Sequence, residues 1–284
     1  MVKIISDSST LYTTAQAAAK NLAVVPLNIQ IGRQSWKDLD EITSTMLLEK
    51  IRQKEIPASS QPSIGEKLAC YEENQHEDAL IDITMAQGLS GTYDSACMAA
   101  AQTGRENIHV FNSRTLCGPH RGMVDLALQM AGEGQSAAKI LAVLEECAAH
   151  EISFLVPRDF SFLKRGGRVS KLEAGLGGAL RLVPVMIKSE DGQHLETFGV
   201  TKTFKRAVRN MITEMSKRGA DASWTFYVSH AFNEDDALKA AEMLKETFPG
   251  ARIITLPLSP VFIAQGGPGC VAVQAIRLRE KAAR

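Results

Sequence analysis

The sequence predicts an α/β fold with two domains, each built around a mainly parallel sheet flanked by helices. Two observations support this prediction. The chain has 284 residues, which allows one large domain or two ordinary domains of roughly 100 to 200 residues each. Short apolar runs alternate with amphipathic helical patterns along the chain. Such alternation is typical of strand–helix–strand units, in which helices cover the faces of a parallel sheet.

The apolar runs and helical patterns locate individual elements. Strands are predicted at residues 2–5, 79–83, 108–111, 152–156, 225–228 and 252–256. Helices are predicted at 136–149 and 233–248, the second with Asn233 as its N-cap and Pro249-Gly250 as its stop. A terminal helical run is expected from Val271. Because the basic, glycine-rich stretch 158–171 breaks the alternation, we expect two domains, residues 1–155 and 156–284.

The composition excludes several classes of protein. Lys and Arg number 32, as do Asp and Glu, so no net charge attracts nucleic acid. The five cysteines are an odd number without a CxxC pair, which argues against a disulfide framework or a zinc site and favours small apolar side chains in a reducing cytosol. No apolar run resembles a signal peptide or approaches the ~20 residues of a membrane span. We therefore expect a soluble, cytoplasmic protein.

Hydroxyl-rich loops follow three predicted strands of the first half, at residues 6–10, 84–92 and 112–115. Ligands bind beyond the carboxyl ends of parallel strands, so these loops indicate one polar pocket. The alternative is that their Ser, Thr and Asp residues only cap helices. A fourth hydroxyl cluster, residues 59–63, is expected to form an ordered turn, with Ser63 and Glu66 spaced as a capping box.

Two glycine-rich segments mark the second half. Stretch 158–171 has five basic residues against one acidic residue, and its Gly166-Gly167-Arg168 could bring backbone and a guanidinium close to an anion. The alternative is a solvated basic turn. Residues 265–270, Gln265-Gly266-Gly267-Pro268-Gly269-Cys270, are expected to form a rigid turn that could line a pocket. Neither a P-loop nor a GxGxxG motif occurs, so no nucleotide cofactor is expected.

Taken in order, these motifs resemble those of the DegV family of bacterial fatty-acid-binding proteins, which includes the FakB subunits of fatty acid kinase. Residues 7–11 are similar to the family's DSxxDL start, 59–63 to TSQPS, 88–93 to GLSGTY, 163–170 to LxxGGRIS and 267–269 to the HxGPG turn. The resemblance covers nearly the whole chain. Three departures stand out: Ser59 replaces Thr, Gln265 stands where many members have His, and residues 180–184 alter the LNIKP stretch.

The resemblance implies that a long-chain fatty acid lies between the two domains, with its tail in an apolar tunnel. It implies that Ser59 and Ser90 hold the carboxylate and that Arg168 offsets its charge. The rest of the implied site comprises Ser60, Thr84, Gly91, Gln265 and Gly266. The protein would then be a carrier that does no chemistry and needs no metal or cofactor.

The resemblance also implies a protein partner, a kinase. The carrier would present the carboxylate to a separate ATP-dependent kinase, related to dihydroxyacetone kinases, for acyl phosphate formation. Transient membrane contact fits this role, and no nucleic-acid partner is expected. The alternative is an enzyme or phosphotransfer module of the same wider fold class, acting on a small anionic substrate. That alternative needs a nucleophile such as His120 or His230 near the pocket. A third hypothesis, nucleic-acid binding, has only stretch 158–171 behind it.

Overall fold

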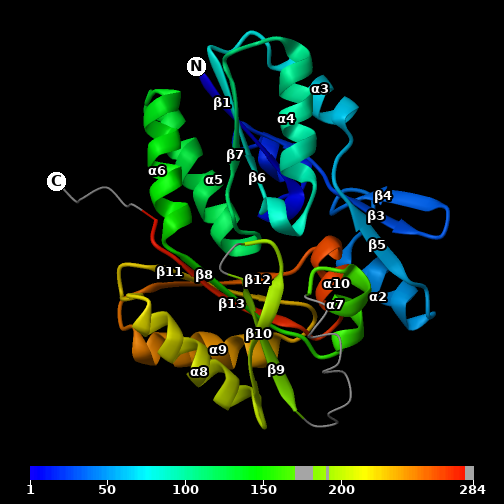
Figure 1. Ribbon diagram of the computed structural model, residues 1–284, viewed down its shortest axis with the longest axis vertical. Helices are drawn as coiled ribbons and strands as arrows, with labels where there is room; N and C mark the ends of the chain where they lie inside the picture. The colour runs from blue at the N-terminus through cyan, green and yellow to red at the C-terminus, as the bar shows by residue number, and fades with distance from the viewer. Residues whose placement is uncertain (170–181, 190–191, 279–284) are drawn as a thin grey trace. The chain divides into compact units, whose positions relative to one another are not determined.

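The computed structural model describes residues 1–169, 182–189 and 192–278. The chain divides into two compact units, Met1–Ala149 and His150–Arg284, each with its own sheets (Figure 1). Part of the predicted glycine-rich region, residues 170–181, lies outside the described residues. None of the described helices is both long enough and apolar enough to cross a membrane.

The first unit contains a four-stranded parallel sheet in the order β2-β1-β6-β7. Its strands are β1 (Val2–Asp7), β2 (Leu22–Val25), β6 (Ala79–Thr84) and β7 (Ile108–Asn112). Figure 1 shows helices on both faces of this sheet. These are α3 (Ile64–Glu73) and α4 (Thr92–Thr103) on one face, and α5 (Cys117–Gly132) and α6 (Ala137–Ala149) on the other. The predicted parallel sheet, its strands at 2–5, 79–83 and 108–111 and the helix at 136–149 are confirmed.

A small antiparallel sheet in the order β4-β3-β5 lies beside the parallel sheet in the first unit. It consists of β3 (Asn28–Ile31), β4 (Gln34–Lys37) and β5 (Pro57–Ser60), while the short helix α1 (Thr14–Ala18) and α2 (Ser44–Arg52) complete the unit. None of these strands was predicted, because each has only four residues and β4 and β5 are largely polar. The expected capping box is confirmed: Ser63 and Glu66 exchange hydrogen bonds at the start of α3.

The second unit contains a six-stranded sheet in the order β10-β9-β8-β13-β11-β12. Its strands are β8 (Glu151–Val156), β9 (Val183–Lys188), β10 (Leu195–Thr201), β11 (Thr225–His230), β12 (Arg252–Pro257) and β13 (Val271–Ile276). Only β11 and β12 pair in parallel. The prediction of a mainly parallel sheet is therefore wrong for this unit. The short connection between β9 and β10 permits only antiparallel pairing, since a parallel crossover needs about a dozen residues.

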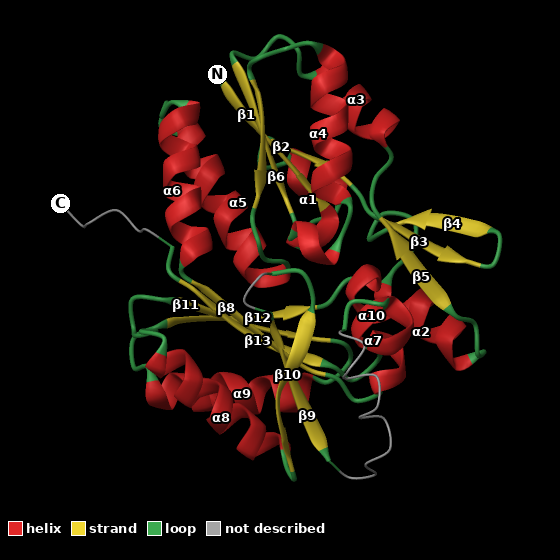
Figure 2. Cartoon of the chain, viewed as in Figure 1, coloured by secondary structure: helices red, strands yellow, loops and turns green. Residues whose placement is uncertain are grey.

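The terminal helix predicted from Val271 is also wrong, since β13 occupies this position (Figure 2). β13 pairs with β8 on one side and β11 on the other, and all six of its residues are buried. A strand covered on both faces shows no apolar–polar alternation, so a short apolar run cannot be told from a helix by its period. The branched side chains of Val271, Val273 and Ile276 favour the extended conformation.

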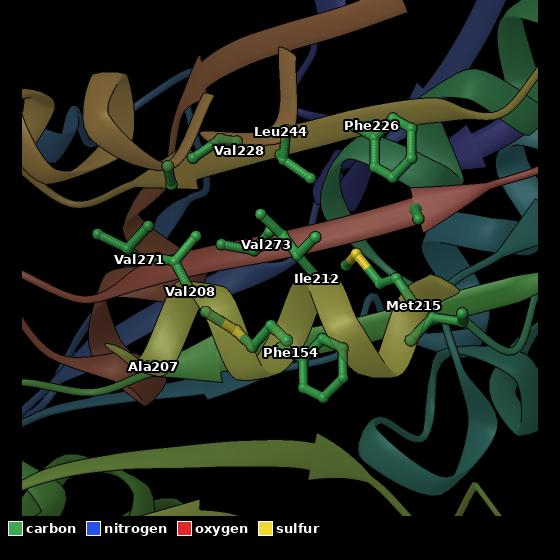
Figure 3. Packing of buried hydrophobic residues seen from close by; sticks show 14 of the residues in the cluster. Phe154, Ala207, Val208, Ile212, Met215, Phe226, Val228, Leu244, Val271 and Val273 are labelled. Carbon is green, nitrogen blue, oxygen red and sulfur yellow. The ribbon is translucent and has the colours of Figure 1, made fainter. Parts of the chain in front are cut away.

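Two helices cover one face of the six-stranded sheet, α8 (Phe204–Lys217) and α9 (Glu234–Thr247). Figure 3 shows Val208 and Ile212 of α8 and Leu244 of α9 packed near Phe226 and Val228 of β11. Because successive side chains of a strand point to opposite faces, Tyr227 and Ser229 face away from this core. Two shorter helices, α7 (Phe160–Gly166) and α10 (Pro260–Gly266), complete the described part of the unit.

The helix predicted at 233–248 is confirmed as α9, and Asn233 occupies its N-cap position as expected. The Asn233 side chain, however, makes no capping hydrogen bond. Its amide instead donates to the Asp236 carboxylate at 3.2 Å and to the carbonyl of Gly269 at 2.9 Å. Asn233 therefore ties the start of α9 to the glycine-rich turn that precedes β13.

Candidate functional site

The hydroxyl-rich turn after β1 is buried and bonded within the first unit. Residues 7–10 are all 0% exposed. The Asp7 carboxylate accepts hydrogen bonds from the backbone N–H groups of Ser9 and Met85, both at 2.9 Å, and so joins the ends of β1 and β6. The Ser8 hydroxyl donates to Asp38 at 2.7 Å. The geometry of this turn supports the capping alternative and not a pocket lining.

His120 of α5 lies beside this turn and is also fully buried. Its Nδ1 contacts the Ser9 hydroxyl, and its Nε2 lies 3.1 Å from the carbonyl oxygen of Ile83. Since a carbonyl can only accept, we assign the ring proton to Nε2, which makes Nδ1 the acceptor for Ser9. Burial lowers the pKa of His120 below its usual value. A buried, neutral imidazole with both nitrogens engaged is not an accessible nucleophile.

His230 is the second histidine that an enzyme hypothesis would use. It lies at the end of β11 and is half-buried, and burial lowers its pKa. Its Nδ1 accepts a hydrogen bond from the backbone N–H of Asn233 at 3.3 Å. The described residues contain no group of three or more His, Cys, Asp or Glu side chains suited to a metal ion.

A buried ion pair anchors α3 to the parallel sheet. Lys67 of α3 donates to both carboxylate oxygens of Asp82 in β6, at 2.9 and 2.8 Å, and both side chains are 0% exposed. The Tyr71 hydroxyl donates to the same carboxylate at 2.6 Å. Each partner compensates a charge that burial would otherwise make costly. The pair thereby fixes α3, and with it residues 61–63, which lead into this helix.

Three of the predicted site residues lie at the end of β6 and in the turn between β6 and α4. Ser90 is half-buried, and its hydroxyl lies 2.8 Å from that of Thr92. Gly91 follows it and is also half-buried. Thr84 differs, because it is fully buried and its hydroxyl donates to the carbonyl of Phe111 at 3.3 Å. Thr84 therefore joins β6 to β7, whereas Ser90 keeps part of its surface accessible.

Residues 59–63 lie against this second turn, but the turn expected for them is wrong at Ser59 and Ser60, which pair with β3 as the end of β5; residues 61–63 connect β5 to α3. A Cβ atom on Gly91 would lie 3.1 Å from Nε2 of Gln61, so the missing side chain lets Gln61 approach the backbone. Asn28 of β3 donates to the carbonyl of Gln61 at 3.2 Å and holds the turn from its other side. The structure thus brings the cluster with Ser59 and Ser60 next to the one with Ser90. The motif of residues 59–63 contains Gln61, but the sequence does not indicate that Gln61 contacts Gly91.

A salt bridge stabilises the same region. Lys37 of β4 donates to Glu66 of α3, and its ammonium also donates to Asn28 at 2.8 Å. Burial alone would raise the pKa of Glu66, but hydrogen bonds from Lys37 and Ser63 outweigh it, so the pKa is lowered. These contacts connect β3, β4 and α3 around residues 61–63, which follow Ser59 and Ser60 of β5.

The remaining predicted residues lie together in the second unit, where α7 packs against α10. A Cβ atom on Gly166 would lie 2.0 Å from Oε1 of Gln265, closer than any side chain can approach. The Arg168 guanidinium donates to the carbonyl of Gly166. Burial lowers the pKa of Arg168, which is half-buried, whereas Lys164 and Arg165 are exposed. Gly166 therefore contacts both Arg168 and Gln265, so the solvated-turn alternative does not fit Arg168. It fits the exposed Lys164 and Arg165, whereas Arg158 is exposed but paired with Asp236 and Lys171 lies outside the described residues.

The glycine-rich turn after α10 is tightly packed. A Cβ atom on buried Gly266 would lie 2.8 Å from Sγ of Cys270. One on Gly267 would lie 2.8 Å from the Phe162 ring, and Gly267 has φ +79°, a conformation that disfavours other residues. Burial raises the pKa of the Cys270 thiol to about 12, so it is an inert packing residue. This turn holds α10 against α7 and so supports the position of Gln265.

The family model described as an uncharacterised protein of the DegV family matches residues 1–278. Protein DegV of Bacillus subtilis is 25% identical over 278 residues, which cover 96% of this chain and 98% of that protein. A DegV domain-containing protein of Clostridium acetobutylicum is 28% identical over 278 residues, which cover 96% of each chain.

Solved structures give the same result. The structure on fatty acid binding of a DegV family protein from Thermus thermophilus is 26% identical, with a TM-score of 0.88 and coverage of 98% of this chain and 99% of that one. The crystal structure of DegV from Bacillus subtilis, described as a fatty acid binding protein, is 25% identical, with a TM-score of 0.83 and coverage of 97% and 99%. Since the family model spans nearly every residue, this chain belongs to the DegV family.

Proposed function

We propose that this chain binds one long-chain fatty acid. The observation that carries the proposal is its similarity, over almost its full length, to the Thermus and Bacillus proteins whose structures are described as fatty acid binding. We assign the carboxylate to the hydroxyls of Ser59 and Ser90, with Arg168 offsetting the negative charge. A carboxylate accepts several charge-assisted hydrogen bonds, which these groups can donate.

The contacts around Gly91 support the assignment of the two serines. Gln61, which directly follows β5 with Ser59 and Ser60, lies against Gly91 beside Ser90, so the two segments adjoin within the first unit. Further contacts are assigned to Ser60, Gly91, Gln265 and Gly266. For Thr84, whose hydroxyl donates to Phe111, we propose the indirect role of holding the end of β6.

The two ends of the ligand have different roles in this proposal. Each buried methylene contributes about 0.8 kcal/mol, so a long acyl tail supplies most of the affinity. The polar headgroup contacts then determine which way the ligand points. Such a carrier keeps a poorly soluble acyl chain out of water.

Titration of delipidated protein with palmitic acid tests the binding proposal. Loss of one hydrogen bond to a charged group costs about 1.5 to 3 kcal/mol, so Ser90→Ala should weaken binding roughly 10- to 100-fold. Ser216→Ala is the matched control, because Ser216 is exposed on α8 and its hydroxyl donates within that helix. Absence of saturable binding by any C14 to C20 acid would refute the proposal, and an unchanged Ser90→Ala would refute the headgroup assignment.

The proposal extends to presentation of the carboxylate to a separate ATP-dependent kinase related to dihydroxyacetone kinases. The kinase transfers the terminal phosphoryl group of ATP to a carboxylate oxygen, which yields an acyl phosphate and ADP. Acyl phosphate should form only when kinase, ATP and the loaded carrier are all present. Formation by the loaded carrier and ATP alone would instead identify this chain as an enzyme.

A further inference from the structure

The six-stranded sheet carries a mostly apolar row of side chains on the face opposite α8 and α9. The strand registers place one residue of each of five neighbouring strands in this row. From β9 to β12 they are Met186, Leu155, Ala272, Ser229 and Leu256. Ser229 belongs to this face because its neighbour Val228 packs in the core on the other side. It is the one polar side chain of the row.

Two buried hydroxyls lie at this end of β11 without a hydrogen-bond partner. Ser229 is 0% exposed and Ser259 is 1% exposed, and within the described part of the chain neither Oγ atom has a partner. The residue before Ser259 is hydrogen-bonded to the residue after Ser229, since the N–H of Leu258 donates to the carbonyl of His230 at 2.8 Å. Ser259, the N-cap residue of α10, therefore lies next to the end of β11 that carries Ser229.

The helix α10 connects this place with the proposed headgroup contacts. It begins directly after Ser259 and ends at Gly266, whose Cβ position lies 3.9 Å from Cδ1 of Leu155, a member of the same row. Seven helical residues span about 10 Å. Gln265, near the end of α10, is one of the residues assigned to the carboxylate. Ser259, at the start of α10, therefore lies about 10 Å from the headgroup contact that α10 supplies near its end.

Buried hydroxyls are normally hydrogen-bonded, and a site with an unpaired polar group discriminates against a ligand that cannot satisfy it. A hydrocarbon tail offers neither a donor nor an acceptor. We propose that Ser229 and Ser259 select a hydroxylated long-chain fatty acid, whose chain hydroxyl hydrogen-bonds with these two serines. This inference rests on the proposed fatty-acid binding. The apolar neighbours Leu155 and Met186 suit the methylenes on either side of that hydroxyl.

The delipidated full chain is titrated with palmitic acid and with monohydroxypalmitic acids whose hydroxyl lies at successive carbons. One net hydrogen bond corresponds to about a 2- to 10-fold gain in affinity, which we expect at one or two neighbouring positions of the hydroxyl. Ser229→Ala and Ser259→Ala should each reduce the preference for the hydroxylated acid over palmitic acid. Each variant should bind palmitic acid at least as tightly as the unaltered protein does. The control Ser216→Ala should keep the preference.

Two results would overturn the inference. One is that every hydroxypalmitic acid binds the unaltered protein no more tightly than palmitic acid does, a comparison that needs no variant. The other is a preference for one hydroxyl position that persists in both serine variants. Failure of all the acids to bind would overturn the proposed function instead. Far-ultraviolet circular dichroism checks that both variants are folded.

Discussion

Replacing Lys67 with Met should strongly destabilise the first unit. The change removes both hydrogen bonds from Lys67 to Asp82, at 2.9 and 2.8 Å, and leaves a fully buried carboxylate that still accepts a hydrogen bond from the Tyr71 hydroxyl. Breaking a buried ion pair in this way costs about 3 to 5 kcal/mol. With a urea dependence of about 2 kcal/mol per M, the unfolding midpoint should fall by roughly 1.5 to 2.5 M.

The two tryptophans allow this measurement in the full chain. Trp36 lies in β4 of the first unit, and Trp224 precedes β11 in the second. In a Trp224→Phe background, Trp36 fluorescence reports urea unfolding of the first unit. Trp36→Phe leaves the reporter of the second unit, whose own transition serves as an internal reference.

Two further variants determine whether the unpaired charge causes the loss. Lys20→Met removes an exposed partner of Asp125, whose oxygen lies 3.7 Å away, and should cost less than about 1 kcal/mol. Lys67→Met combined with Asp82→Leu removes both charges and should recover most of the stability. A midpoint shift below about 0.5 M for Lys67→Met, or no recovery in the double variant, would refute the reasoning.

Two other substitutions test the packing and the buried histidine. Gly267→Ala should destabilise the second unit, because the added Cβ would lie 2.8 Å from Phe162 and the residue has φ +79°. The control Gly104→Ala also has a positive φ, +65°, but its Cβ would meet open space, so it should lower the free energy of unfolding by only about 1 kcal/mol. Urea unfolding of the two variants compares these losses. The lowered pKa of His120 means that below about pH 6.5 the unfolded chain binds more protons than the folded chain. The free energy of unfolding of the first unit should therefore fall with decreasing pH, by up to about 1.4 kcal/mol per pH unit until the folded pKa is reached. His120→Gln should flatten this slope, and an unchanged slope would show that other groups cause it.

The first unit was largely predictable because its strands and helices follow one another in the order that a parallel sheet requires. Its apolar strands are bounded by polar loops, and the helix at 136–149 has a clear apolar face. The second unit was less predictable. β13 is short, apolar and buried on both faces, and nothing local in the sequence specifies that it pairs antiparallel with β8 and β11.

The residues of the candidate site that belong to sequence motifs were predictable. The tertiary contacts between them were not. Ser90 and Arg168 stand in motifs with a recognisable order along the chain. The approach of Gln61 to Gly91 and of Gln265 to Gly166 depends on tertiary packing, which no local pattern encodes. Residues 7–10 were expected to line a pocket, but their side chains make internal hydrogen bonds instead. The same polar side chains suit both roles. Burial distinguishes these two roles, and it is known only once the chain has folded.

The position of β13 has a consequence for synthesis of the protein on the ribosome. The central pairings of the six-stranded sheet join residues far apart in sequence, such as Ser153 and Gln274, which are separated by 121 positions. Until β13 has emerged, β8 and β11 lack their shared neighbour, and open strand edges favour wrong association. The first unit has all its strands by Asn112 and faces no such delay. Nascent chains are therefore most vulnerable to aggregation after the first unit has folded and before residue 276 is released.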